Sequence, residues 1–554
     1  EELEADRYRF GNLIRKLDNI YEKRGIRIEL FEWEDYDAAY NGMRKQDEYN
    51  ERVRASDMFL ALFHKKAGKF TIEEFNIARK AFDEQASPKI YTYIKDLEAG
   101  ESESRELAEF KRLMLEELGH YWCRYSNFDT MQLHFVLQLQ MVEATTPIKV
   151  EVKESQVKIG DSTIADLNNV PFTSENATHR ELQSRKEQLD REIGNAESGG
   201  RRGFFGQRSR MTDEELANLR EERESVTEQI ERQEKALVDT AMSIARMQGG
   251  ECSPRMRTAA ELFEKGEIDK AEAVLKEDDM EADATNAKLK FDTAAQPTAE
   301  LTRNIERCAG EYMLKARIVV SGIADESRYR QAVKLMSTAI DLVSGRLPEE
   351  TLAEYLFDYA VLLTDTDQQT KALETWERLS GIYERLYRKA PQKYAYGYAG
   401  VLNNMAVLYS DKGDFDHCLS KYLKAIDIYD WLDREEPGIY DDDIARLKNN
   451  LGTLYSDRDE YNKALSEFNE AARIRFELLA KDNDPDSRSA LADIYCNMAT
   501  ALQFSDHPQE ALRYIAQAHA ILDELDKEFP RIYEYKLYSI LNREGSIYTL
   551  SLIH

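Results

Sequence analysis

The sequence predicts a multidomain protein: an α/β domain with a parallel sheet, a small β excursion, a coiled-coil helical hairpin and an all-α solenoid. Three observations predict this fold class. Short apolar runs alternate with helical periodicity over residues 1–146, a heptad-like seam runs through residues 177–248, and small residues recur at a fixed interval over residues 249–554. Residues 147–176 alternate with period two and predict a β-hairpin spacer.

Length, charge and cysteine usage bound the function. A chain of 554 residues suits several domains of about 100 to 200 residues each. Its 105 acidic and 76 basic residues give a net charge of -29, so nucleic acid is not expected as a partner. The apolar runs fall short of the roughly 18 residues that span a bilayer, and the five scattered cysteines show no metal-ligand spacing. We therefore expect a cytoplasmic protein without a structural metal or a membrane segment.

The N-terminal region alternates helices and strands. The predicted helices span 3–23, 47–55, 72–84, 103–118 and 129–143, and the predicted strands are IRIELF (26–31), MFLALF (58–63), KIYTYI (89–94) and HYWCRYS (120–126). This alternation predicts a parallel sheet with helices on both faces. Ligands of such sheets bind at the carboxyl ends of the strands.

The segment from 177 to 248 predicts a charged helical hairpin. Apolar positions at alternating steps of three and four form the seam of a coiled coil. They are Leu182, Leu189 and Ile193 on one arm, and Leu216, Leu219, Arg223, Val226, Ile230, Gln233 and Leu237 on the other. GGRRGFFGQRSR (199–210) separates the arms and predicts a mobile basic tip, with docking on an acidic partner or RNA as the alternative.

The C-terminal region repeats. Small residues recur at spacings of 46, 46, 47 and 46, and each of the first four has a second small residue twelve positions later. The first set is Ala360, Ala406, Gly452, Ala499 and Gly545, and the second is Ala372, Cys418, Ala464 and Ala511. Antiparallel helices need small side chains where their backbones approach, so each pair of positions predicts one helical hairpin.

Weaker copies of the repeat, Ala259 with Ala271 and Ala316 with Ala332, extend it upstream to about six units and a closing helix. LKNNLGTLYSDRDEYNKALSEFNEAARI (447–474) resembles tetratricopeptide repeats (TPR). Units of that family are nearer 34 residues, so longer helices are expected here.

The segment SDMFLALFHKKAGKFTIEEFNIARKAF (56–82) holds the candidate functional residues. Thr71-Ile72-Glu73-Glu74 has the form of a capping box, in which the threonine hydroxyl accepts a backbone N–H three residues on and Glu74 reaches back. Local sequence favours this structural role. The position of Glu74 after the predicted strand MFLALF instead favours a role in ligand binding or catalysis. HKKAGKFT lacks the glycine and the Ser or Thr that a phosphate-binding loop needs.

The order IRIELFEWED, a loop with Gly42 and Arg44, SDMFLALF, FTIEEFNIA, PKIYTYIKD and HYWCRYS resembles a flavodoxin-like prokaryotic Toll/interleukin-1 receptor (TIR) domain over about residues 1–145. The resemblance implies that Glu74, which precedes Phe75, matches the glutamate that enzymatic members need to cleave NAD+. Glu73 is the alternative register. The family's first strand and the loop after it are not visible, so we expect an N-terminal piece of the site to be absent.

Three more residues and Thr71 are candidates for binding the substrate by stacking or by pairing with phosphate: Trp33, Arg44 and Phe70. Trp33 serves equally as a core residue at a strand end, and Arg44 as a solvated loop charge. A carboxylate suits the proposed chemistry because cleavage of the nicotinamide–ribose bond passes through an oxocarbenium-like state. Nicotinamide leaves as a neutral group, so a second acid is not required.

Together the two resemblances imply an immune effector of TIR–TPR type. Its activity would be NAD+ glycohydrolysis, switched on by self-association of TIR domains into a homo-oligomer or filament, with a protein trigger on the solenoid, in prokaryotic antiviral defence. NAD+ is the substrate and no cofactor is implied. The product, ADP-ribose or a cyclic isomer, stays open. A non-enzymatic scaffold for protein assembly is the main alternative, and a different nucleotide-processing module is a third.

Overall fold

The computed structural model describes residues 3–22, 26–32, 45–98, 100–114, 122–139, 150–153, 155–159, 162–198, 212–246, 252–322, 325–481, 483, 485–528 and 533–553. The chain divides into two compact units, one with the described residues up to Pro348 and one with those from Glu349. Each unit is described by itself. Among the described residues, no helix combines the length and the apolar character needed to cross a membrane.

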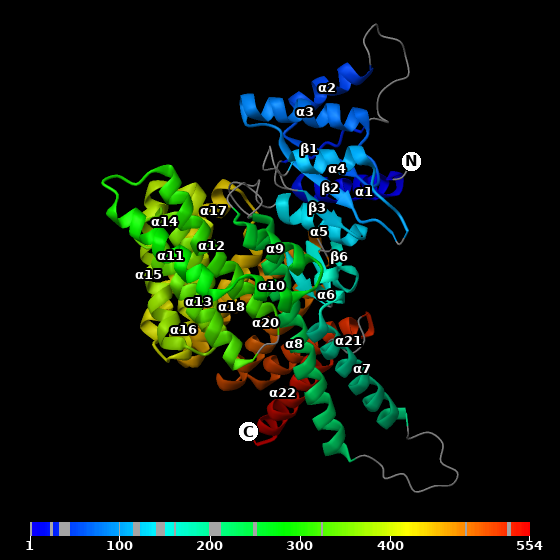
Figure 1. Cartoon of the computed structure of the whole chain (residues 1–554). Coiled ribbons are helices and arrows are strands. Elements are labelled where there is room, and N and C mark those ends of the chain that lie inside the picture. Colours follow the sequence, from blue (N-terminus) through cyan, green and yellow to red (C-terminus); the bar gives the residue numbers. More distant parts are fainter. Residues whose placement is uncertain are drawn as a thin grey trace. The chain divides into compact units, whose positions relative to one another are not determined.

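The first unit begins with a parallel three-stranded sheet in the order β1-β2-β3 (Figure 1). Its elements in chain order are α1 (Glu4–Glu22), α2 (Lys45–Ala55), β1 (Met58–Phe63), α3 (Lys69–Gln85), β2 (Lys89–Lys95), α4 (Arg105–Arg112), β3 (Cys123–Tyr125) and α5 (Phe128–Leu139). Pairing in register runs from Met58 with Lys89 to Phe63 with Ile94. The predicted parallel sheet is therefore confirmed for three of its four strands.

The fourth predicted strand, IRIELF, is wrong, because residues 26–32 adopt no regular secondary structure. The backbone N–H of Ile28 donates to the side chain of Asp18 on α1, at 2.8 Å, instead of to a neighbouring strand. Ile26 and Phe31 are exposed. Alternating apolar residues indicate a strand only where a sheet edge is open to receive it.

Helices pack on both faces of the sheet, as the alternation predicted. On one face, Phe75 of α3 and Phe110 of α4 meet edge to face at 5.0 Å beside Ile94 of β2. Tyr93, the preceding residue of β2, points to the opposite face, where its hydroxyl lies 3.0 Å from Nδ1 of His134 on α5. The three strands are thus fixed from both sides.

Helix α1 is tied to the carboxyl ends of two strands by a buried ionic contact. Asp6 is 6% exposed and accepts from Lys95 Nζ at 2.8 Å and from Tyr125 Oη at 3.1 Å. Phe10 of α1 also meets Phe135 of α5, with ring centroids 4.8 Å apart. A buried carboxylate needs such partners to offset the loss of its hydration. These contacts therefore fix the position of α1 against the sheet.

A second, antiparallel sheet follows and has one strand more than the predicted hairpin. It orders β4 (Glu151–Lys153), β5 (Gln156–Ile159) and β6 (Ser162–Asp166) as a meander. Two short helical turns, η3 (Leu167–Asn169) and α6 (Pro171–Ser174), lead from it into the helical hairpin.

The helical hairpin consists of α7 (Ala177–Ser198) and α8 (Asp213–Arg246). Its buried seam contains Leu189, Val226 and Ile230, all among the predicted seam positions. At its base, Glu234 is fully buried, accepts from Ser155 Oγ at 2.6 Å and lies 2.8 Å from Nε2 of His179. The basic tip predicted at 199–210 lies outside the described residues.

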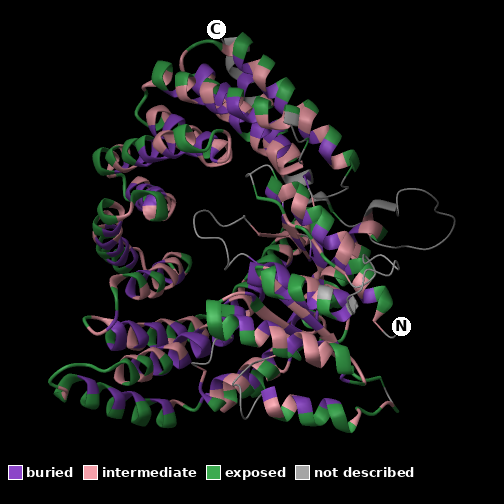
Figure 2. Ribbon diagram, turned by 90° about the horizontal axis from the view of Figure 1, so that it is seen from above, coloured by how far each residue is buried: buried purple, intermediate pink, exposed green. Residues whose placement is uncertain are grey.

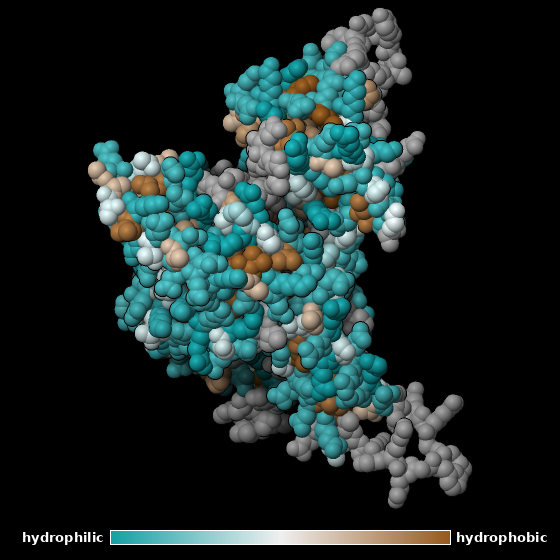
Figure 3. Space-filling model, viewed as in Figure 1, coloured by the Kyte–Doolittle hydropathy of each residue, from teal (hydrophilic) through white to brown (hydrophobic). Residues whose placement is uncertain are grey.

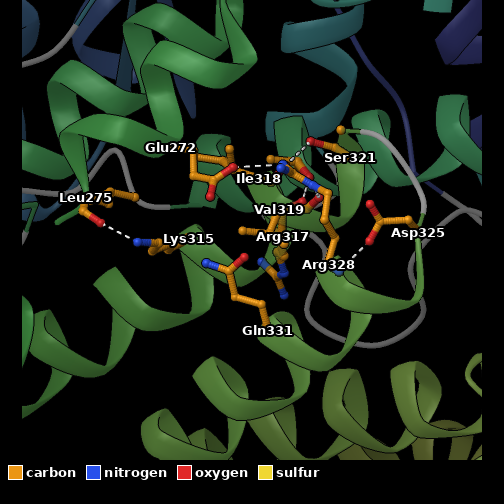
Figure 4. Close-up of polar contacts among 12 residues, drawn as sticks. Glu272, Leu275, Lys315, Arg317, Ile318, Val319, Ser321, Asp325, Arg328 and Gln331 are labelled. Atoms are coloured by element: carbon orange, nitrogen blue, oxygen red, sulfur yellow. Dashed lines mark hydrogen bonds and ion pairs between the residues drawn. The ribbon is translucent and has the colours of Figure 1, made fainter. Parts of the chain in front are cut away.

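The described residues of the first unit continue with α9 (Pro254–Glu264), α10 (Ile268–Val274), α11 (Glu277–Thr293), α12 (Ala299–Ser321) and α13 (Glu326–Val343). Polar contacts join α10, α12 and α13 (Figure 4). Lys315 of α12 donates to the carbonyl of Leu275 at 2.8 Å, and Arg328 of α13 donates to Glu272 of α10 at 2.7 Å. Arg328 also donates to the carbonyl of Val319 at 3.1 Å, which closes the network.

The second unit is a solenoid of helical hairpins that resembles tetratricopeptide repeats. Its helices are α14 (Glu349–Asp365), α15 (Gln369–Lys389), α16 (Pro391–Asp411), α17 (Phe415–Glu435), α18 (Asp441–Asp457), α19 (Tyr461–Lys481), α20 (Pro485–Phe504), α21 (Pro508–Glu528) and α22 (Glu534–Ile553). Buried residues line the sides on which these helices meet (Figure 2). Helices of 17 to 21 residues account for the long repeat.

The recurring small residues lie where helices approach closely, as predicted. Ala360, Ala406 and Ala499 are fully buried, and so are their partners twelve residues on. At Gly452, an added Cβ would lie only 2.5 Å from the ring of Phe468 on the paired helix. Gly545 differs, because an added Cβ there would meet nothing within 4 Å.

A second periodicity emerges in the turns inside the hairpins. Each turn contains one residue with positive φ: Asp367 (54°), Gly413 (70°), Asp459 (59°) and Asp506 (66°). These positions follow the same spacing as the small residues, and Asp and Gly are among the residues that adopt this left-handed conformation most readily. The turn chemistry therefore repeats together with the helix packing.

Candidate functional site

The candidate site lies where β1 ends and α3 begins. The strand ends at Phe63, and α3 starts at Lys69, six residues later. Because β1 belongs to a parallel sheet, this connection lies at the carboxyl edge, where ligands of such sheets bind. The backbone thus brings Phe70, Thr71 and Glu74 to that edge on the first two turns of one helix.

The structure contradicts the predicted capping box. The N-cap of α3 is Gly68, with an extended backbone and no side-chain cap, and the backbone N–H of Ile72 donates to its carbonyl at 3.0 Å. Thr71 is the third residue inside the helix, and Glu74 lies in the second turn. Glycine is itself a favoured N-cap residue, so the helix begins three residues earlier than predicted. Neither Thr71 nor Glu74 is needed to start it.

Amide side chains from α2 hold the two glutamates. Gln46 Nε2 donates to Glu74 Oε1 at 2.8 Å, and Asn50 Nδ2 donates to Glu73 Oε1 at 3.0 Å. Gln46 Nε2 also contacts Asn50 Oδ1, at 3.2 Å. Gln46 and Asn50 are 2% and 4% exposed, one helical turn apart. These contacts fix the orientation of the Glu74 carboxyl and join α2 to α3.

Electrostatics distinguish Glu74 from an ordinary surface carboxyl. Burial raises its pKa above the usual value, the hydrogen bond from Gln46 opposes that rise, and the charge of Glu73 adds to it. Gln46 Oε1 is buried and has no hydrogen-bond partner among the described residues. The site therefore combines a partly desolvated carboxyl with an unsatisfied acceptor beside it, and both can take a donor from a ligand.

The predicted substrate-binding residues divide into two groups. Phe70 is 52% exposed, and its side chain is a helical-turn neighbour of Glu74. Thr71 is half-buried on the same turn as Phe70. Trp33 and Arg44 lie outside the described residues, so their predicted roles stay predictions.

Sequence reasoning missed Gln46 and Asn50. Their signal is a pair of amides four residues apart, followed three residues later by Val53, so that all three share one helix face. Val53 is 4% exposed and belongs to the core under the sheet. Two amides in line with a core residue indicate a buried polar contact.

The first two basic residues of the loop between β1 and α3 contact an acidic residue of the protein. Lys65 Nζ pairs with Glu101 Oε1 at 2.5 Å, and His64 Nε2 lies 3.3 Å from the other oxygen of Glu101. The hydrogen bond from Lys65 lowers the pKa of Glu101. Within the described ranges, no group of three acidic, His or Cys side chains is arranged to hold a metal.

Comparisons with known proteins find no matching family model and no matching curated protein. Several solved structures are similar. BtubC (BKLC) from P. vanneervenii is 19% identical, with 45% of this chain and 92% of that one covered and a TM-score of 0.34. The apo form of RapI is 16% identical, with coverage of 66% and 86% and a TM-score of 0.37.

A third similar structure is a signal-transduction ATPase with a tetratricopeptide-repeat sensor from Pyrococcus horikoshii. It is 11% identical, with 92% of this chain and 84% of that one covered and a TM-score of 0.30. All three TM-scores lie below 0.5. The assignment of the solenoid therefore rests on the helix pairing and the repeat spacing described above.

Proposed function

We propose that the N-terminal domain is a TIR-like NAD+ glycohydrolase in which Glu74 is the catalytic carboxylate. The observation that carries this proposal is the environment of Glu74 after β1. Its side chain does not cap α3, a buried amide orients it at 2.8 Å, and burial raises its pKa. Functional sites commonly contain carboxyls whose pKa is shifted by burial and by neighbouring charges.

The proposed reaction cleaves the bond between the ribose C1′ and the nicotinamide nitrogen. Nicotinamide leaves with the bonding electron pair as a neutral molecule, a water oxygen bonds to C1′, and one proton is released to solvent. The ionised Glu74 stabilises the positive charge that develops on the ribose in the transition state. Gln46 keeps the carboxylate in a fixed orientation, and exposed Phe70 offers a face on which a ring can stack.

Two neighbouring glutamates allow a matched experiment. Glu74→Gln keeps the size and the hydrogen-bonding capacity but removes the charge, and should lower the rate of nicotinamide release by about 10² to 10³. Glu73→Gln is the control, because Glu73 has the corresponding contact with Asn50, and should keep most of the activity. Equal rates of nicotinamide release by Glu74→Gln and Glu73→Gln, with equal midpoints of thermal unfolding, would show that Glu74 has no catalytic role.

We further propose that the solenoid is the sensor. Stacked hairpins each bury faces only against their neighbours, which leaves an extended surface for a protein ligand. In this proposal a protein trigger on the solenoid promotes self-association of the N-terminal domains into a homo-oligomer or filament, and the activity serves prokaryotic antiviral defence in the cytoplasm. The product is ADP-ribose or a cyclic isomer, which mass spectrometry separates.

One observation favours the alternative, a non-enzymatic scaffold. The paired contacts of Gln46 with Glu74 and of Asn50 with Glu73 also serve to join α2 to α3. If joining helices were their whole purpose, Glu73→Gln and Glu74→Gln would lower stability equally, and the wild-type protein would release no nicotinamide. The same pair of variants therefore separates the two functions.

A further inference from the structure

A cavity of about 160 Å³ lies in the first unit, beside β3 and the end of β2 and against helices α8 and α9. None of its lining residues belongs to α2 or α3, so the cavity is distinct from the site around Glu74. Small-molecule sites commonly form at junctions between structural elements. The residues of the lining therefore indicate which class of molecule the cavity can hold.

The apolar part of the lining comes from four separate segments of the first unit. Its residues are Trp122 before β3, Pro171 on α6, Ile244 on α8, and Met256 and Ala260 on α9. Protein interiors are normally packed with few spaces larger than a water molecule, and an apolar cavity of about 150 Å³ can hold benzene. This cavity therefore has room for one six-membered ring with a small substituent.

The charges around the cavity balance one another. The lining contains three acidic and three basic side chains: Asp96, Glu261 and Glu264, and Arg124, Arg257 and Lys265. Arg124 Nε donates to Asp96 Oδ1 at 2.8 Å. Burial raises the pKa of Glu264, and the charges of Arg124 and Lys265 oppose this rise. A charged ligand would lose its hydration and disturb this balance, so the lining favours a neutral ligand.

Two of the apolar residues distinguish an aromatic ring from an aliphatic one. Trp122 offers an indole ring, and contacts between aromatic rings are more favourable than their buried area alone accounts for. The thioether of Met256, which is 4% exposed, also makes favourable contacts with aromatic rings. An aliphatic molecule of the same size would bury a similar area but would gain neither contact.

We propose that this cavity is a binding site for a small neutral aromatic molecule with one ring. The ring lies against Trp122 and Met256, in the space that the small side chain of Ala260 leaves open. Because the lining comes from several segments, a bound ring would join α8 and α9 to β3. This proposal is independent of the NAD+ reaction, because it uses none of the residues around Glu74.

Four molecules of nearly equal size test the class of the ligand. Benzyl alcohol is the neutral aromatic probe, benzylamine is its cationic counterpart, benzoate its anionic counterpart and cyclohexylmethanol its aliphatic counterpart. Binding to the full-length protein is measured at pH 7.5 by calorimetry and by saturation-transfer NMR. We expect benzyl alcohol to bind, and both charged molecules to bind at least about tenfold more weakly because they lose hydration. Cyclohexylmethanol should bind several-fold more weakly, because it lacks the aromatic contacts.

Substitutions on α9 test the place of binding. Ala260→Leu fills the cavity and should weaken the binding of benzyl alcohol at least about tenfold. Thr258→Leu is the matched control, because Thr258 is exposed on the same helix and does not line the cavity. It should change the affinity less than about threefold. Met256→Leu keeps the volume but removes the sulfur, and should reduce the preference for benzyl alcohol over cyclohexylmethanol.

Circular dichroism confirms that each variant is folded before it is compared. Wild-type affinity for benzyl alcohol in a folded Ala260→Leu variant would overturn the proposal. So would tighter binding of benzylamine or benzoate than of benzyl alcohol, equal binding of benzyl alcohol and cyclohexylmethanol, or no binding of benzyl alcohol up to 10 mM. None of these outcomes depends on whether the protein cleaves NAD+.

Discussion

Gly452 on α18 provides a quantitative test of the repeat packing. In Gly452→Ala, the new Cβ would lie 2.5 Å from Cε1 and 2.6 Å from Cδ1 of Phe468, whose side chain is 1% exposed. A ring enclosed on all sides cannot move aside cheaply, so overpacking costs about 1–3 kcal/mol. Alanine gains about 1 kcal/mol over glycine in a helix, which leaves a net destabilisation of up to about 2 kcal/mol.

Gly400 on α16 is the matched control, because an added Cβ there would meet nothing within 4 Å. Gly400→Ala keeps only the gain in helix propensity and should stabilise the solenoid by up to about 1 kcal/mol. The two variants should therefore differ by about 1–3 kcal/mol, the overpacking cost alone. Native-state hydrogen exchange in α16 to α19 measures the difference. Equal effects of the two substitutions would refute the packing argument.

Four other predictions follow from single features. Gly413 has φ of 70°, so Gly413→Val should destabilise the solenoid by about 1–2 kcal/mol in urea unfolding. Leu189 is fully buried in the hairpin seam, so Leu189→Ala should cost about 2–5 kcal/mol by hydrogen exchange in α7 and α8, whereas Glu187→Ala, its exposed neighbour, should have little effect. Burial raises the pKa of Glu264 to about 7, so the free energy of unfolding should be highest below about pH 4.5 and should fall by up to about 3 kcal/mol as the pH rises through 7; Glu264→Gln should remove this pH dependence from the unfolding curves. Because burial raises the pKa of Glu74 and the proposed reaction needs its ionised form, kcat/KM should fall on the acid side at a pH above the pKa of an ordinary glutamate, and a pH profile lacking that limb would exclude the role.

The periodicity of the sequence correctly predicted those elements whose pattern of apolar or small residues marks a buried face. The strands at 58–63 and 89–94 and the small residues of the solenoid were predictable, because each pattern reports directly on a face that its neighbour buries. IRIELF shows the limit. Its alternation is that of a strand, but the backbone N–H of Ile28 donates to the side chain of Asp18 on α1, a contact on which the alternation of apolar residues does not report.

The candidate site was predictable in position but not in detail. Glu74 was identified from its place after β1, whereas its supposed capping role was wrong because Gly68 begins the helix earlier. Gln46 and Asn50 contact the glutamates across 28 and 23 residues of sequence. Contacts between different helices depend on how the helices pack against each other. The spacing of residues within one helix does not indicate this packing.

The most direct test of the central claim is to incubate the full-length protein with NAD+ over a range of protein concentrations and to measure free nicotinamide by mass spectrometry. Our account predicts one nicotinamide released for each NAD+ consumed, with a specific rate that rises with protein concentration as the N-terminal domains associate. Glu74→Gln should release almost none under the same conditions. Absence of nicotinamide from the wild-type protein at every concentration, including assembled samples, would contradict the account.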